Sequence, residues 1–149
     1  MQLVKYEGLG NKFLVTIADT VPEESRELAL KFCDPENGFD ADGLIFGTPP
    51  TSSGIDIHMT LFNADGSSAE ISGNGIRCLA QEIFSKTEET SLQILTGSGV
   101  RNVNLDNLNG EVAKISVDMG TVRDGPDLPL LDLNNINEIA KFIENKFLV

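Results

Sequence analysis

The residues with the clearest chemical potential are Ser72-Gly73-Asn74-Gly75, directly before an expected helix. The first turn of a helix has backbone N–H groups without intrahelical acceptors, and the helix dipole adds partial positive charge there. Two glycines let a ligand carboxylate approach this backbone closely. The segment therefore predicts an anion site at the helix start, with the side chain of Ser72 beside the bound anion.

Ser72 also has a purely structural interpretation, because serine is a favoured N-cap residue. On physical grounds alone, the cap is the stronger of the two interpretations. Arg77 follows in the same helix, where we expect it to pair with Asp65 or Glu70. Cys78 is expected to pack in the core as a small apolar residue.

The pattern of apolar residues predicts an α+β domain with mostly antiparallel strands and one buried central helix. The central helix follows Ser72, and its apolar stripe consists of Ile76, Leu79, Ala80, Ile83 and Phe84. Further helices are expected at 22–32 and, with an amphipathic pattern, at 134–146. Strands are expected where β-forming residues cluster or alternate between turns, at 2–6, 13–17, 44–46, 55–63, 91–97, 100–106 and 111–119.

The composition excludes several classes of partner. The chain has 149 residues, a net charge of −12, one histidine and two cysteines. Such acidity leaves no evident basic surface, so neither nucleic acid nor an anionic membrane is expected as a partner. The scattered His and Cys have no metal-ligand spacing, so no metal site is expected. With no bilayer-spanning apolar run and no signal-peptide pattern, a cytoplasmic protein is expected.

Several motifs resemble those of the diaminopimelate epimerase family, in the order and spacing of that family, from residue 1 to about 120. They are GLGNKF at 8–13, Cys33-Asp34, Ala41-Asp42-Gly43, FNADG at 62–66, Ala69-Glu70 and GNGIR at 73–77. The resemblance implies an antiparallel sheet curled around a central helix. This domain would be one half of a two-domain fold, with the active site in the cleft between the halves.

The resemblance also implies a chemistry for particular residues. Family members interconvert LL- and meso-diaminopimelate on the route to lysine, with two cysteines and without pyridoxal phosphate, metal or another cofactor. Asn11 and Asn63 fall where family asparagines bind this small amino-acid substrate. Gly73 and Asn74 fall where backbone N–H groups bind its carboxylate, and Ser72 falls where the first catalytic cysteine stands.

Ser72 is the departure from the family pattern that matters most. A serine hydroxyl titrates far above a thiol and needs a partner base to lose its proton. The single histidine, His58, is expected in a strand, and nothing places it near Ser72. Three explanations stay open: an engineered substitution that traps a ligand or prevents oxidation, a natural weak acid or base, and a catalytically inactive chain.

The chain matches about the first half of a family member. We expect the motif-bearing domain at 1–126, then an amphipathic helix and the start of a truncated strand at 127–149, with the second domain and its cysteine missing. The expected function is half of an amino-acid isomerase, with little or no activity alone. The alternatives are a one-base racemase or dehydratase assembled by dimerisation across the exposed inter-domain face, and a non-catalytic amino-acid-binding module.

Overall fold

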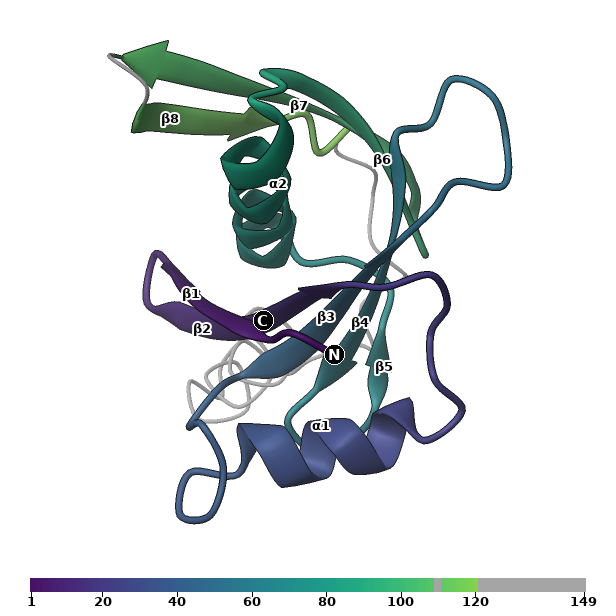
Figure 1. The fold of residues 1–149 in the computed structure, drawn as a ribbon, viewed down its shortest axis with the longest axis vertical. Helices are drawn as coiled ribbons and strands as arrows, with labels where there is room; N and C mark the ends of the chain where they lie inside the picture. Colours follow the sequence, from purple (N-terminus) through teal and green to yellow (C-terminus); the bar gives the residue numbers. More distant parts are fainter. Residues whose placement is uncertain (109–110, 121–149) are drawn as a thin grey trace, which may run out of the picture.

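Helix α2 (Gly73–Thr87) is the element around which the sheet curls (Figure 1). The computed structural model describes residues 1–108 and 111–120. The predicted apolar stripe faces the core, with Ile76, Leu79, Ala80 and Phe84 buried and Ile83 packed against them. The prediction of a central helix after Ser72 is therefore confirmed.

One sheet of eight strands forms in the described part of the chain, in the order β1-β2-β3-β4-β6-β7-β8, with β5 beside β4. The strands are β1 (Val4–Gly8), β2 (Asn11–Ile17), β3 (Gly43–Thr48), β4 (Ile57–Asn63), β5 (Ser68–Ala69), β6 (Ser91–Thr96), β7 (Gly99–Leu108) and β8 (Glu111–Val117). All seven predicted strand regions are present. The β1–β2 hairpin turns at Leu9 and Gly10, which both have positive φ, as a two-residue turn between twisted strands requires.

Most neighbouring strands are antiparallel, as predicted, but the pairs β2–β3 and β4–β6 are parallel. A parallel pair needs a long crossover, whereas a short turn gives an antiparallel pair. Helix α1 (Ser25–Cys33) lies in the connection from β2 to β3, and α2 lies in the connection from β4 to β6. The two helices are thus the reason for the two parallel pairs, which residue periodicity does not reveal.

The two helices pack on opposite faces of the sheet, so the core has two parts. On β2, Phe13 and Val15 contact the core around α2, whereas Leu14 belongs to the core around α1. Because both faces are covered, β3 is buried along its whole length. Figure 1 shows α1 outside the curl and α2 inside it.

Helix α1 begins three residues later than predicted. Residues 22–25 form a separate turn, in which the N–H and the hydroxyl of Ser25 both donate to the carbonyl of Pro22. The predicted helix at 134–146 and the whole segment 127–149 lie outside the described residues. Among those described, no helix is both long and apolar enough to cross a membrane.

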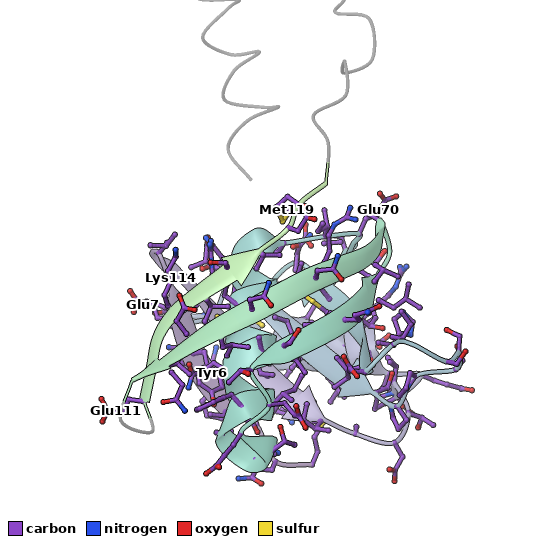
Figure 2. The ribbon with its side chains drawn as sticks, turned by 90° about the horizontal axis from the view of Figure 1, so that it is seen from above. Tyr6, Glu7, Glu70, Glu111, Lys114 and Met119 are labelled. Atoms are coloured by element: carbon purple, nitrogen blue, oxygen red, sulfur yellow. The ribbon has the colours of Figure 1, made fainter. Side chains whose placement is uncertain are left out.

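The curl leaves an open seam between β1 and β8, which stand at opposite ends of the strand order. A groove along the seam is lined by residues of both edge strands, including Tyr6, Glu7, Lys114 and Ile115. Figure 2 shows Glu7 and Lys114 on the same side of the molecule. The hydroxyl of Tyr6 donates to the buried carboxylate of Glu82 on α2 at 2.7 Å, which fastens β1 to the helix.

The two cysteines are sealed in the two parts of the core. Cys33 is 2% exposed in the part around α1, and Cys78 is 4% exposed in the part around α2. Burial raises the pKa of each thiol to about 11, because the thiolate loses its hydration; for Cys33, the charge of Asp42 adds to the effect. The prediction that Cys78 is a core residue is confirmed.

Truncation of a leucine tests the central role of α2. Leu79 is fully buried, whereas Leu30 on α1 is 51% exposed. We expect Leu79→Ala to lower the free energy of unfolding by about 2–5 kcal/mol, because it removes buried methyl groups and leaves a cavity. The matched variant Leu30→Ala should cost much less. Urea denaturation of both variants measures the difference, and equal losses would contradict the packing described here.

The buried thiols predict how stability depends on pH. In the unfolded chain a thiol titrates near pH 8.5, whereas in the folded chain both pKa values are about 11. Between these values the unfolded chain loses protons that the folded chain keeps. The thiols' contribution to the free energy of unfolding should therefore be constant below about pH 8 and fall as the pH rises toward 11. Urea midpoints from pH 7 to 10 measure this decline, which should be shallower in a Cys33→Ala, Cys78→Ala double variant.

Candidate functional site

The start of α2 is capped by Ser72. Its backbone is extended, its Oγ accepts from the N–H of Gly75 at 3.0 Å, and its carbonyl accepts from the N–H of Ile76 at 2.8 Å. The structural interpretation of Ser72 as an N-cap is thus confirmed. The hydroxyl thus satisfies one of the free N–H groups of the first helical turn, whereas the bond from Ile76 is the first i→i−4 bond of the helix.

Two other N–H groups of the first turn belong to Gly73 and Asn74. Within residues 1–108 and 111–120, neither has a hydrogen-bond acceptor. Both residues line a cavity of about 570 Å³, a size typical of small-molecule sites. Free N–H groups and the positive end of the helix dipole at such a cavity favour an anion.

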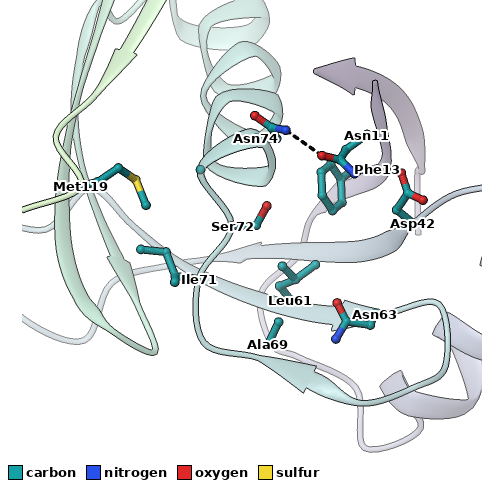
Figure 3. Close-up of a pocket in the computed structure, with 11 residues that line it drawn as sticks. Asn11, Phe13, Asp42, Leu61, Asn63, Ala69, Ile71, Ser72, Asn74 and Met119 are labelled. Atoms are coloured by element: carbon teal, nitrogen blue, oxygen red, sulfur yellow. Dashed lines mark hydrogen bonds between the residues drawn. The ribbon is translucent and has the colours of Figure 1, made fainter. Parts of the chain in front are cut away.

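All five predicted site residues line this one cavity, and they come from three elements (Figure 3). Asn11 is the first residue of β2, Asn63 is the last residue of β4, and Ser72, Gly73 and Asn74 form the start of α2. The sequence motifs that carry these residues are far apart in the chain. The fold therefore brings together what the motifs predicted as a group.

Strand register explains why the polar residues meet at one end of the sheet. Phe13 on β2 lies opposite Gly43 on β3, and Gly43 lies opposite Asn63 on β4. Asn11 and Asp42 therefore stand at the same edge as Asn63. The backbone of Asp42 joins the two sides, because its N–H donates to the carbonyl of Lys12 and its carbonyl accepts from the N–H of Ala64.

Asp42 is a cavity residue that the sequence analysis did not select, although it lies within one of the family motifs. One oxygen, Oδ2, accepts from the backbone N–H of Lys12 at 2.7 Å and from the side-chain amide of Asn11 at 3.4 Å. Asp42 is exposed, and its Oδ1 accepts no hydrogen bond within the described residues. The cavity thus has a carboxylate with an oxygen available to a ligand.

Asn63 is held by the turn that follows β4. Its Nδ2 donates to the hydroxyl of Ser67 at 2.9 Å, and its carbonyl accepts from the N–H of Gly66, which closes a turn at 63–66. Ser67 in turn donates to Asp65, and this hydrogen bond lowers the pKa of the Asp65 carboxyl. With its nitrogen occupied, Asn63 can offer its side-chain oxygen to a ligand.

Apolar side chains form the rest of the lining. They are Phe13, Leu61, Ala69, Ile71 and Met119. Figure 3 shows Ile71 and Met119 on the side of the helix start opposite Asp42 and Asn63. A β-carbon on Gly73 would lie 3.5 Å from the sulfur of Met119, so this methionine lies beside Gly73 at the helix start.

Arg77 does not pair with Asp65 or Glu70, so that prediction is wrong. Its guanidinium donates instead to the side-chain oxygen of Asn74, three residues earlier on the helix. Glu70 receives a long hydrogen bond of 3.4 Å from the hydroxyl of Ser98. Residues three apart on a helix face one another, which favours the local partner.

The described lining of the cavity contains few ionisable side chains. His58, Cys33 and Cys78 do not line it, and among the described lining residues Asp42 is the one ionisable side chain. No group of three or more His, Cys, Asp or Glu in the described part of the chain is arranged to hold a metal ion. Ser72 therefore has no histidine or thiol beside it in this part of the chain.

Removal of the cap tests the structural role of Ser72. We expect Ser72→Ala to lower the free energy of unfolding by about 0.5–2 kcal/mol, because the N–H of Gly75 loses its acceptor. Ser53→Ala, in the exposed loop between β3 and β4, is the matched control and should leave stability unchanged. Chemical denaturation measures both, and an unchanged Ser72→Ala protein would contradict the cap.

Sequence comparisons place this chain beside one group of enzymes. A family model described as diaminopimelate epimerase matches residues 3–124. The chloroplastic diaminopimelate epimerase of Oryza sativa subsp. japonica is 39% identical over 135 residues, which cover 87% of this chain and 37% of that protein. The diaminopimelate epimerase of Caldanaerobacter subterraneus subsp. tengcongensis is 38% identical over 149 residues, covering 97% of this chain and 51% of that protein. The chain thus spans about half the length, or less, of these curated relatives.

Solved structures share the fold. A probable proline racemase from Agrobacterium radiobacter K84 aligns with a TM-score of 0.63 at 16% identity, over 77% of this chain and 40% of that chain. A phenazine biosynthesis protein of the PhzF family from Bacillus anthracis aligns with a TM-score of 0.58 at 23% identity, over 74% of this chain and 38% of that chain. These similarities show the curled α+β fold alone. The match to the family model covers most of the chain, including every predicted site residue, and shows that the chain belongs to the diaminopimelate epimerase family.

Proposed function

We propose that the cavity binds a small amino acid of the diaminopimelate type, with a carboxylate at the start of α2. The observation that carries this proposal is the pair of free N–H groups, of Gly73 and Asn74, at a cavity that also contains Asp42. The N–H groups suit a carboxylate, whereas Asp42 and the side-chain oxygen of Asn63 suit an ammonium group. A ligand with both charged groups matches both sides of the cavity.

We further propose that the chain contributes half of an isomerase site that acts at the α-carbon without pyridoxal phosphate, in the pathway to lysine. Family membership supports this proposal, and so does the place of Ser72 beside the free N–H groups. In this arrangement Ser72 stands where a base would remove the α-proton. A second acid–base group would come from a complementary half or from a second copy of the chain; self-association across this face stays a prediction.

A specific observation favours a second candidate, an amino-acid-binding module without catalysis. The hydroxyl of Ser72 is engaged as a helix cap, and no histidine or thiol lines the cavity within the described residues. A hydroxyl without a base is a poor acceptor for an α-proton. Ligand binding would then occur without any exchange at the α-carbon.

Proton exchange in D₂O separates the two candidates. We expect Ser72→Cys to incorporate deuterium at the α-carbon of diaminopimelate, because a helix start lowers the pKa of a thiol and favours the thiolate. The thiolate would take the α-proton, exchange it with solvent and return a deuteron to the same face, so the configuration would be retained. NMR of diaminopimelate incubated with each protein measures the exchange. Ser53→Cys controls for an exposed thiol elsewhere.

The outcomes have distinct meanings when ligand binding is measured in parallel by calorimetry. Exchange by Ser72→Cys but not by the unmodified chain would support the isomerase site and show that the serine prevents the exchange. Binding by both proteins without exchange would support the binding module. No binding of diaminopimelate at millimolar concentration by either protein would refute the proposed amino-acid site.

A further inference from the structure

A chain of hydrogen bonds connects Arg77 to the cavity. The guanidinium of Arg77 donates to Oδ1 of Asn74, and Nδ2 of Asn74 donates to Oδ1 of Asn11 at 2.6 Å. Nδ2 of Asn11 then donates to Oδ2 of Asp42 at 3.4 Å. The hydrogen-bond chain thus starts at the guanidinium on α2 and ends at the carboxylate of Asp42 beside β3, with two side-chain amides between them.

Arg77 determines the direction of these hydrogen bonds. A guanidinium can only donate hydrogen bonds, so the oxygen of Asn74 must face Arg77 and its nitrogen must face Asn11. Asn11 therefore receives a donor on its oxygen and turns its own nitrogen toward Asp42. A flip of either amide would set two donors or two acceptors against each other, and aligned hydrogen bonds reinforce one another.

We propose that Arg77 is a positioning residue that makes Asn11 a hydrogen-bond donor toward the ligand. Arg77 does not line the cavity, whereas Asn74 and Asn11 do. The oxygen of Asn11 accepts from Asn74 and one of its amide N–H groups donates to Asp42, so its second N–H remains for a ligand oxygen. The site then has two asparagines of opposite polarity, with a donor at Asn11 and an acceptor at Asn63, whose nitrogen is held by Ser67.

The role of Asn11 toward a ligand rests on the proposed amino-acid site, but the hydrogen bonds themselves form without a ligand. In ¹⁵N-labelled protein, the side-chain amides of Asn11 and Asn74 should exchange with solvent more slowly than that of the exposed Asn104 on β7. We expect Arg77→Met to abolish this protection at both residues. The affinity for diaminopimelate should fall by about tenfold, the size expected for one disturbed hydrogen bond.

Two further variants separate positioning from packing. Arg101→Met is the matched control, because Arg101 on β7 is also partly buried and donates to backbone carbonyls away from the cavity. It should leave both amides protected. Arg77→Lys keeps a donor for Asn74 and should restore part of the protection; no restoration would assign the effect to lost packing and overturn the proposal.

The remaining outcomes also decide the matter. Unchanged protection of Asn11 and Asn74 in a folded Arg77→Met protein would overturn the proposal. If that variant does not fold, the unmodified protein decides, because an Asn74 amide that exchanges as fast as Asn104 would overturn it equally. Protection that depends on Arg77 without any binding of diaminopimelate would support the hydrogen-bond chain and refute the amino-acid site.

Discussion

The close approach of the first turn of α2 to the sheet is the constraint on which the site depends. A β-carbon on Gly75 would lie 3.1 Å from a methyl carbon of Ile45 and 3.2 Å from the terminal methyl of Met59, closer than an ordinary contact. Glycine lets the helix start rest directly on β3 and β4, and the buried side chains of Ile76 and Leu79 hold it there. The free N–H groups are thus presented by a closely packed part of the fold, which suits a site that must recognise a ligand by direction.

Local patterns were sufficient to predict most elements, because turn residues and apolar periodicity act over short distances. The alternation at 55–63 became β4, and the stripe from Ile76 to Phe84 became the buried face of α2. The two parallel strand pairs were not predicted, because they depend on where each helical crossover returns to the sheet. The later start of α1 was also missed, since Pro22 and Ser25 close a turn that competes with the helix.

The site was predicted only in part, because some of its contacts also depend on how distant segments pair. Motif resemblance selected five residues that share one cavity, since a family motif records positions that the fold brings together. It did not select Asp42, whose place in the cavity follows from the register between β2 and β3. The partner of Arg77 was predicted wrongly from charge. In the structure, the side-chain amide of Asn74, three residues away, is the acceptor in place of the expected carboxylate.

The open seam has a consequence for how the domain meets other chains. The outer edges of β1 and β8 present backbone groups that another strand could extend by pairing, and such edges are common sites of aggregation. Each edge strand, however, carries exposed charges of both signs, Lys5 and Glu7 on β1 and Glu111 and Lys114 on β8. Pairing with an arbitrary strand would bury these charges without partners. The charges on both edge strands therefore discourage indiscriminate pairing at the seam.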